Sequence, residues 1–183
     1  NSIKKDKNKK KVNILSDSLF KKIYIIKNEK LPEIINVDNK YFLAEIKSIQ
    51  VSNKNPDRLV LGADSVISLN NELINKPKSR DEALGILKKL NNSKHYLISS
   101  VCISKNGSMV WSHSDSSELK MKSLEEHQLS AYLGKIKTQT LLDYGVYQIE
   151  ADGLALFEYI KGDLDSIMGL PIKDIINYIN QYK

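Results

Sequence analysis

The residues best suited to chemistry in this chain are an aspartate and a lysine that flank an apolar segment. Asp64 lies in Gly62-Ala63-Asp64-Ser65 after an apolar run, and Lys76 precedes Pro77 twelve residues further on. A carboxylate between two apolar runs is costly to charge unless a cation pairs with it, and glycine lets a ligand approach the backbone closely. The pair could therefore form a phosphate or metal site. The alternative is that Asp64 is buried and caps a tight turn.

Other polar residues fall where strands are expected to end, and ligands of open α/β sheets collect at such edges. They are Ser16, Ser18, Ser65, Ser99, Ser100 and Glu150. The sequence has no glycine-rich phosphate loop, nucleophile elbow or Cys/His pair. His95 is far in sequence from His113 and His127, without metal-ligand spacing. The polar set is thus a second pointer to one site at a sheet edge.

The elements that must position these side chains alternate between strands and helices. Apolar runs predict strands over 12–15, 96–103, 109–113, 118–121, 144–150 and 154–160, and a strand–turn–strand over 59–69. Helical spacing predicts helices over 40–51, from Ser79 to about Asn91, from Ser123 to about Leu133, and after Pro171. Residues 19–37 remain ambiguous, because Ile23–Ile26 favours a strand while Leu19–Lys22 could open a helix. The fold class is α/β with a mixed, twisted sheet and flanking helices.

Two helices begin with a capping-box pattern, and one hairpin has a clear turn. Ser79 with Glu82, and Ser123 with Glu126, carry the hydroxyl and carboxylate that satisfy free N–H groups of a first turn. Asn106-Gly107 predicts a tight turn between two strands.

Charge and composition limit the class of protein. The chain has 183 residues and a net charge of +6, but residues 1–11 hold five of the six excess positive charges. We expect a disordered basic tail over 1–11, rather than a nucleic-acid arm, and one α/β domain over 12–183. The single cysteine, Cys102, fits a reducing compartment. No stretch is apolar for the ~20 residues of a membrane span, so a cytoplasmic protein without nucleic-acid or membrane partners is expected.

Five motifs in order resemble the Maf family of nucleoside triphosphate pyrophosphatases over about residues 40–183. They are Gly62-Ala63-Asp64-Ser65, Lys76-Pro77, Ala83 with Leu87-Lys88-Lys89-Leu90, His95 to Val101, and Ile160-Lys161-Gly162-Asp163 with Ile167 to Ile172. The resemblance implies cleavage between the α- and β-phosphates of a nucleotide with Mg²⁺ or Mn²⁺. It also implies two lobes around a cleft, as in inosine triphosphatase-like architectures.

The resemblance also implies roles for particular residues. Asp64 would be the general base and hold the metal or its water, Lys76 would bind phosphate, and Ser16 with Lys21 would bind the β,γ end. Lys47 and Ser65 are further expected substrate contacts. The family's opening Ser-x-Ser-Pro-Arg-Arg appears as Ser16-Asp17-Ser18-Leu19-Phe20-Lys21, and its Asp-Lys-Ala-Gly appears as Leu142-Asp143-Tyr144-Gly145.

Two further positions bear on the nucleobase. The family branch preferring 7-methyl-GTP has an aromatic residue and a glutamate where the pyrimidine branch has arginine and glutamine, and this chain has Phe20 and Glu150. A carboxylate accepts from the N1–H and N2–H of guanine, and a methylated, cationic base gains roughly 0.5–2 kcal/mol over an aromatic face. Alternatively, Phe20 is a core residue and Glu150 pairs with a lysine.

Two functions remain open at this point. The first is a metal-dependent pyrophosphatase acting on nucleoside triphosphates, including modified ones such as 7-methyl-GTP. The second is a nucleotide-binding regulatory protein of the same fold with impaired catalysis. Whether Ser16 and Lys21 face the same cleft as Asp64 would distinguish them. A homodimer is left open.

Overall fold

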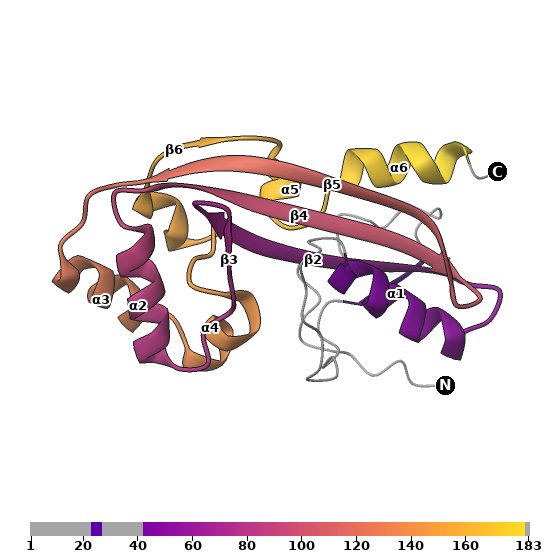
Figure 1. Cartoon of the computed structure of the whole chain (residues 1–183), viewed down its shortest axis with the longest axis horizontal. Coiled ribbons are helices and arrows are strands. Elements are labelled where there is room, and N and C mark those ends of the chain that lie inside the picture. Colours follow the sequence, from indigo (N-terminus) through magenta and orange to yellow (C-terminus); the bar gives the residue numbers. More distant parts are fainter. Residues whose placement is uncertain (1–22, 27–41, 182–183) are drawn as a thin grey trace.

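The computed structural model describes residues 23–26 and 42–181, which form one sheet with helices at both ends (Figure 1). The strands are β1 (Ile23–Ile26), β2 (Leu59–Leu69), β3 (Glu72–Ile74), β4 (Lys94–Lys105), β5 (Ser108–Met121) and β6 (Phe157–Lys161). Their order is β1-β2-β4-β5-β6, and β3 pairs with β2. Only the β1–β2 pairing is parallel among the described strands. The predicted α/β class with a mixed sheet is confirmed.

Most of the helices lie near the two ends of the long strands. They are α1 (Phe42–Lys54), α2 (Arg80–Leu90), α3 (Glu126–Gly134), α4 (Thr138–Tyr144), the 3₁₀ helix η3 (Asp152–Leu156), α5 (Leu164–Ile167) and α6 (Ile172–Gln181). In Figure 1, α2, α3 and α4 lie together at one end, while α1 and α6 lie at the other. No helix in these described ranges is long and apolar enough to span a bilayer.

Strand alternation places α1 and α6 on opposite faces of the sheet. Leu61 and Ala63 of β2 pack with Ile175 and Ile179 of α6, and Gly62 between them faces α1. Successive side chains of a strand point to opposite faces, so even-numbered β2 residues share the α1 face. Asp64 therefore belongs to the face that α1 covers.

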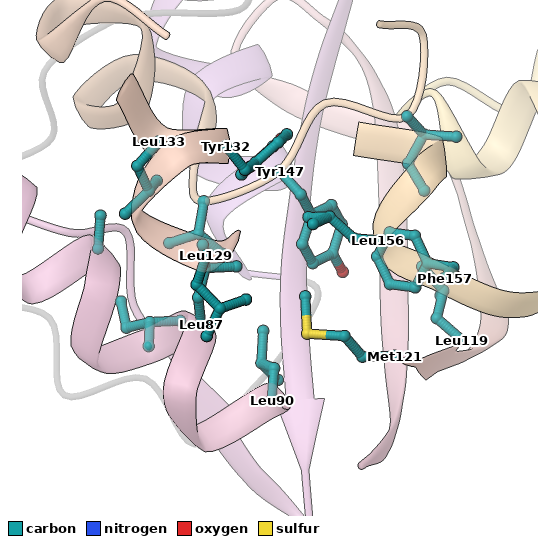
Figure 2. Close-up of a cluster of buried hydrophobic side chains, with 14 of the residues drawn as sticks. Leu87, Leu90, Leu119, Met121, Leu129, Tyr132, Leu133, Tyr147, Leu156 and Phe157 are labelled. Carbon is teal, nitrogen blue, oxygen red and sulfur yellow. The ribbon is translucent and has the colours of Figure 1, made fainter. Parts of the chain in front are cut away.

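Two hydrophobic clusters stabilise the two ends. The larger one, at the end with α2, α3 and α4, includes Leu87, Leu90, Leu119, Met121, Leu129, Tyr147 and Phe157 (Figure 2). The smaller one lies under α6 and includes Leu61, Val101, Ile103 and Ile175. The α2 helix contributes its buried residues Ala83, Ile86, Leu87 and Leu90 to the larger cluster.

Several sequence-based boundaries were wrong. Residues 59–69 form one uninterrupted strand without a turn at Gly62, and 109–113 and 118–121 belong to the single strand β5. The predicted strand over 144–150 is absent, because α4 runs to Tyr144 and η3 begins at Asp152. The β6 strand begins at Phe157, since η3 takes up the start of the predicted 154–160 strand.

The predicted turn and the Ser79 cap are confirmed, but the second capping box is formed by other residues. Asn106 and Gly107 adopt the positive φ angles of a tight turn, 50° and 77°. The Ser79 hydroxyl accepts from the Glu82 N–H as predicted, but the Glu82 carboxylate accepts from the Lys78 N–H. The second capping box is formed by Glu125 and Gln128 and not by Ser123. The predicted strand 12–15 and the basic tail lie outside the described residues.

Candidate functional site

The site centres on a buried ion pair between Asp64 of β2 and Lys47 of α1. Lys47 Nζ lies 2.5 Å from Asp64 Oδ1, and the two side chains are only 7% and 11% exposed. The same ammonium lies 3.5 Å from the Ala63 carbonyl oxygen. A buried carboxylate requires such a partner. The cation that pairs with Asp64 is Lys47, and not Lys76 as the sequence suggested.

Close packing of α1 on the sheet brings these charges together. A Cβ on Gly62 would lie 2.3 Å from the Ala44 carbonyl oxygen and 2.8 Å from the Ser48 nitrogen. The Ser48 hydroxyl also lies 2.7 Å from that of Ser104 on β4. Gly62 thus serves the approach of the helix, and the hydroxyl pair fixes α1 over β2 and β4.

Lys76 approaches the same charges from the other end of the molecule. It follows β3, and its Nζ donates to the Asp143 carbonyl oxygen in the last turn of α4 at 2.8 Å. Desolvation of the ammonium, opposed by the charges of Asp64 and Asp143 and reinforced by Lys47, lowers the pKa of Lys76 below its ordinary value. Lys76 is therefore within electrostatic range of the ion pair, and its role in binding phosphate stays a prediction.

Ser65 is directed away from this group. Its hydroxyl lies 2.9 Å from that of Ser99, and Ser99 donates to the Ser166 carbonyl of α5 at 2.6 Å. The strand periodicity that places Asp64 under α1 places Ser65 on the α6 face. The structure does not bring Ser65 beside Asp64, so its role in substrate contact stays a prediction.

Ser100 is a site neighbour that was not among the expected substrate contacts. It is the cross-strand partner of Asp64, and Ser114 donates to its hydroxyl at 2.6 Å. The sequence analysis placed Ser100 in the polar set at the sheet edge, and the strand register, which the sequence does not determine, puts it beside Asp64. The Asp143 carbonyl was missed, because every residue has a backbone carbonyl and the sequence offers no signal for this one.

The remaining predicted residues are placed differently. Glu150 is exposed on the connection between α4 and η3. Ser16, Phe20 and Lys21 lie outside the described residues. Whether Ser16 and Lys21 face the same cleft as Asp64 therefore stays a prediction. The predicted cleft between lobes also stays a prediction.

Asp64 is the metal ligand that the sequence predicts. Within 42–181 no group of three His, Cys, Asp or Glu side chains could hold an ion. Mg²⁺ is often bound through one or two carboxylates together with substrate phosphates and water. Asp64 fits that donor set as the protein's own carboxylate.

Comparison with known proteins shows the family of this chain. The sequence profile described as Maf-like protein matches residues 13–182. A nucleoside triphosphate pyrophosphatase of Pelagibacter ubique is 46% identical over 93% of this chain and 85% of its own length. A 7-methyl-GTP pyrophosphatase of Brucella abortus is 35% identical over 77% and 71%, respectively. A nucleoside triphosphate pyrophosphatase of Ruegeria pomeroyi is 34% identical over 75% and 69%. With the profile spanning nearly the whole chain, the protein belongs to the Maf-like family.

Proposed function

We propose that this protein hydrolyses nucleoside triphosphates to the monophosphate and pyrophosphate. The observation that carries the proposal is Asp64 paired with Lys47 within the electrostatic reach of Lys76. The similar proteins from Pelagibacter and Ruegeria, both called nucleoside triphosphate pyrophosphatases, support it.

The residues can divide the work between water and phosphate. Asp64 would orient a water molecule and take its proton as the water attacks phosphorus. Lys76 would bind the phosphates and, with Lys47, offset the charge that develops on the leaving pyrophosphate. Phosphoryl chemistry depends mainly on positioning and charge stabilisation, which suits a site built from one acid and two cations.

We propose that the reaction uses Mg²⁺ or Mn²⁺ held by Asp64 and the substrate phosphates. A divalent cation would neutralise phosphate charge and orient the attacking water. The carboxylate is the donor type that these ions prefer. Entry of the cation would compete with Lys47 for the Asp64 oxygen atoms, so Lys47 would then be available to the substrate.

A panel of triphosphates tests the activity and the metal together. GTP, 7-methyl-GTP, UTP and dTTP should release pyrophosphate with Mg²⁺ or Mn²⁺, and release should stop in excess EDTA and resume when metal is restored. Nucleotide binding without turnover of any member would overturn the proposal and favour the regulatory alternative. Full activity in EDTA would overturn the metal requirement alone.

We further propose a preference for guanine, and for 7-methyl-GTP in particular, through Glu150. The Brucella relative is called a 7-methyl-GTP pyrophosphatase, and a carboxylate accepts from both N1–H and N2–H of guanine. Glu150→Gln should shift the ratio of kcat/KM for 7-methyl-GTP over UTP toward UTP by at least about tenfold, since a charged hydrogen bond contributes roughly 1.5–3 kcal/mol. An unchanged ratio with lowered stability would assign Glu150 a structural role.

A further inference from the structure

Arg80 joins three helices at a point away from the ion pair. It is the first residue of α2, is half-buried, and donates through Nη1 to the Leu133 carbonyl at 2.5 Å. Its Nη2 donates to the Ile136 carbonyl at 2.7 Å and to the Thr138 hydroxyl at 3.0 Å. These three acceptors span the end of α3 and the start of α4. The planar guanidinium suits such a set of acceptors, which a lysine ammonium cannot reproduce.

The opposite end of α4 holds the Lys76 ammonium. Lys76 Nζ donates to the Asp143 carbonyl, and the unpaired carbonyl groups at a helix C-terminus favour a cation. Lys76 and Arg80 are four residues apart, so one short segment contacts α4 at its end through Lys76 and at its start through Arg80. The position of α4 along this segment thus sets where the Asp143 carbonyl meets Lys76.

We propose that Arg80 is a positioning residue, which fixes α4 so that the Asp143 carbonyl holds Lys76 toward Asp64. This inference rests on the proposed phosphate role of Lys76. Without Arg80, α4 would lose its contacts at the α3–α4 junction, and the Asp143 carbonyl would no longer hold the exposed Lys76 side chain in one place. Substrate binding would weaken first, because Lys76 would then pay the cost of ordering its side chain on binding.

A double-mutant cycle tests whether Arg80 acts through Lys76. Arg80→Ala should raise KM for GTP about three- to tenfold and change kcat less, as expected when ground-state binding is lost. In a Lys76→Ala background the same substitution should change kcat/KM less than about twofold. Equal losses in both backgrounds, or no loss in the wild-type background, would overturn the proposal.

Two milder variants, Arg80→Lys and Thr138→Val, keep the test informative if Arg80→Ala folds poorly. Arg80→Lys keeps the charge but loses the planar set of donors, so its KM for GTP should rise. Thr138→Val removes one acceptor and leaves both carbonyls, so its KM should lie between those of the wild type and Arg80→Lys. Lys88→Ala is the matched control, because Lys88 also lies on α2 but pairs with Glu126 of α3 at 2.6 Å. A KM increase in Lys88→Ala equal to that of Arg80→Lys would contradict the proposal.

The Lys76 pKa gives a readout that does not depend on turnover. Lysines carrying ¹³C-methyl groups can be titrated by NMR, with the Lys76 signal assigned from Lys76→Arg. The Lys76 pKa should lie below its ordinary value of 10.5 in the wild type and move toward 10.5 in Arg80→Lys, while Lys88→Ala leaves it unchanged. A Lys76 pKa unaffected by Arg80→Lys would refute the positioning role, even if no triphosphate proved to be a substrate.

Discussion

The charges of Lys47 and Asp64 depend on each other because both side chains are buried. Their oxygen and nitrogen atoms are 2.5 Å apart, and water has little access to either side chain. Breaking a buried pair by removing one partner leaves an uncompensated charge, which typically costs about 3–5 kcal/mol. The pair is therefore a stability element as well as the proposed reaction centre.

Lys47→Met should lower the free energy of unfolding by about 3–5 kcal/mol, because Asp64 is left buried and unpaired. The double variant Lys47→Met/Asp64→Leu should recover most of that loss and remain inactive. Urea unfolding followed by circular dichroism measures both. Lys88→Met, which breaks an exposed pair with Glu126, is the control and should cost no more than about 1 kcal/mol. A Lys47→Met variant as stable as the wild type would refute the mutual dependence of the Lys47 and Asp64 charges.

His95 is a buried residue outside the proposed site. Its ring packs against Tyr147 and Phe157, with centroids 5.8 and 5.9 Å away, and its Nε2 lies 3.2 Å from the Tyr147 hydroxyl. The side chain is fully buried. Desolvation, opposed by a hydrogen bond to the Ser93 backbone, lowers the pKa of His95 from 6.5 to about 4. His95 is thus a core residue, in keeping with the lack of metal-ligand spacing between it and the other histidines.

Stability should fall on acidification because the unfolded chain binds a proton at His95 before the folded chain does. The stability that the neutral His95 contributes is complete above pH 6.5 and is lost as the pH falls toward about 4. The free energy of unfolding should fall by about 3 kcal/mol over this range. His95→Gln should remove this component from the stability–pH curve, whereas His127→Gln, at an exposed position, should leave it. Curves of the same slope for wild type and His95→Gln would contradict the assignment.

At the scale of elements, β2 shows which features could be predicted from the sequence and which could not. The apolar residues on both sides of Gly62 predicted a strand, but the ion-pair partner of Asp64 is Lys47 of α1 and not Lys76. The turn at Gly62 was wrong because glycine there serves the close approach of α1, a long-range contact with no local signature. The false strand over 144–150 has a similar origin, since Val146 and Tyr147 are buried by the larger cluster in a segment without strand pairing.

Gly62→Ala should push α1 away from the sheet, since its Cβ would overlap the Ala44 carbonyl. We expect a loss of about 1–3 kcal/mol in stability and a fall in kcat/KM, because α1 carries Lys47. Gly85→Ala is the matched control: nothing lies within 4 Å of its Cβ, so this exposed helical position should gain roughly 0.5–1 kcal/mol. Thermal unfolding and initial rates measure both effects, and equal behaviour of the two variants would contradict the packing argument.

At the scale of the whole molecule, the proposed site combines groups from both ends of the sheet. Lys47 comes from α1 at one end, and Lys76 is held by α4 at the other (Figure 1). The strands β2, β4 and β5 run between the two hydrophobic clusters and set the distance between these ends. The mixed sheet and flanking helices could be predicted from alternating apolar patterns. The contacts of Arg80 could not, because two of its three acceptors are backbone carbonyls.

The most direct test of the account is the identity of the products from GTP with Mg²⁺, followed by ³¹P NMR for wild type and Asp64→Asn. The wild type should give only GMP and pyrophosphate in equal amounts. Asp64→Asn should bind GTP, yet form these products about 10²–10⁴ times more slowly, because an amide cannot accept the proton from water. GDP and inorganic phosphate as wild-type products, or an Asp64→Asn variant with more than about a tenth of the wild-type kcat, would contradict the account.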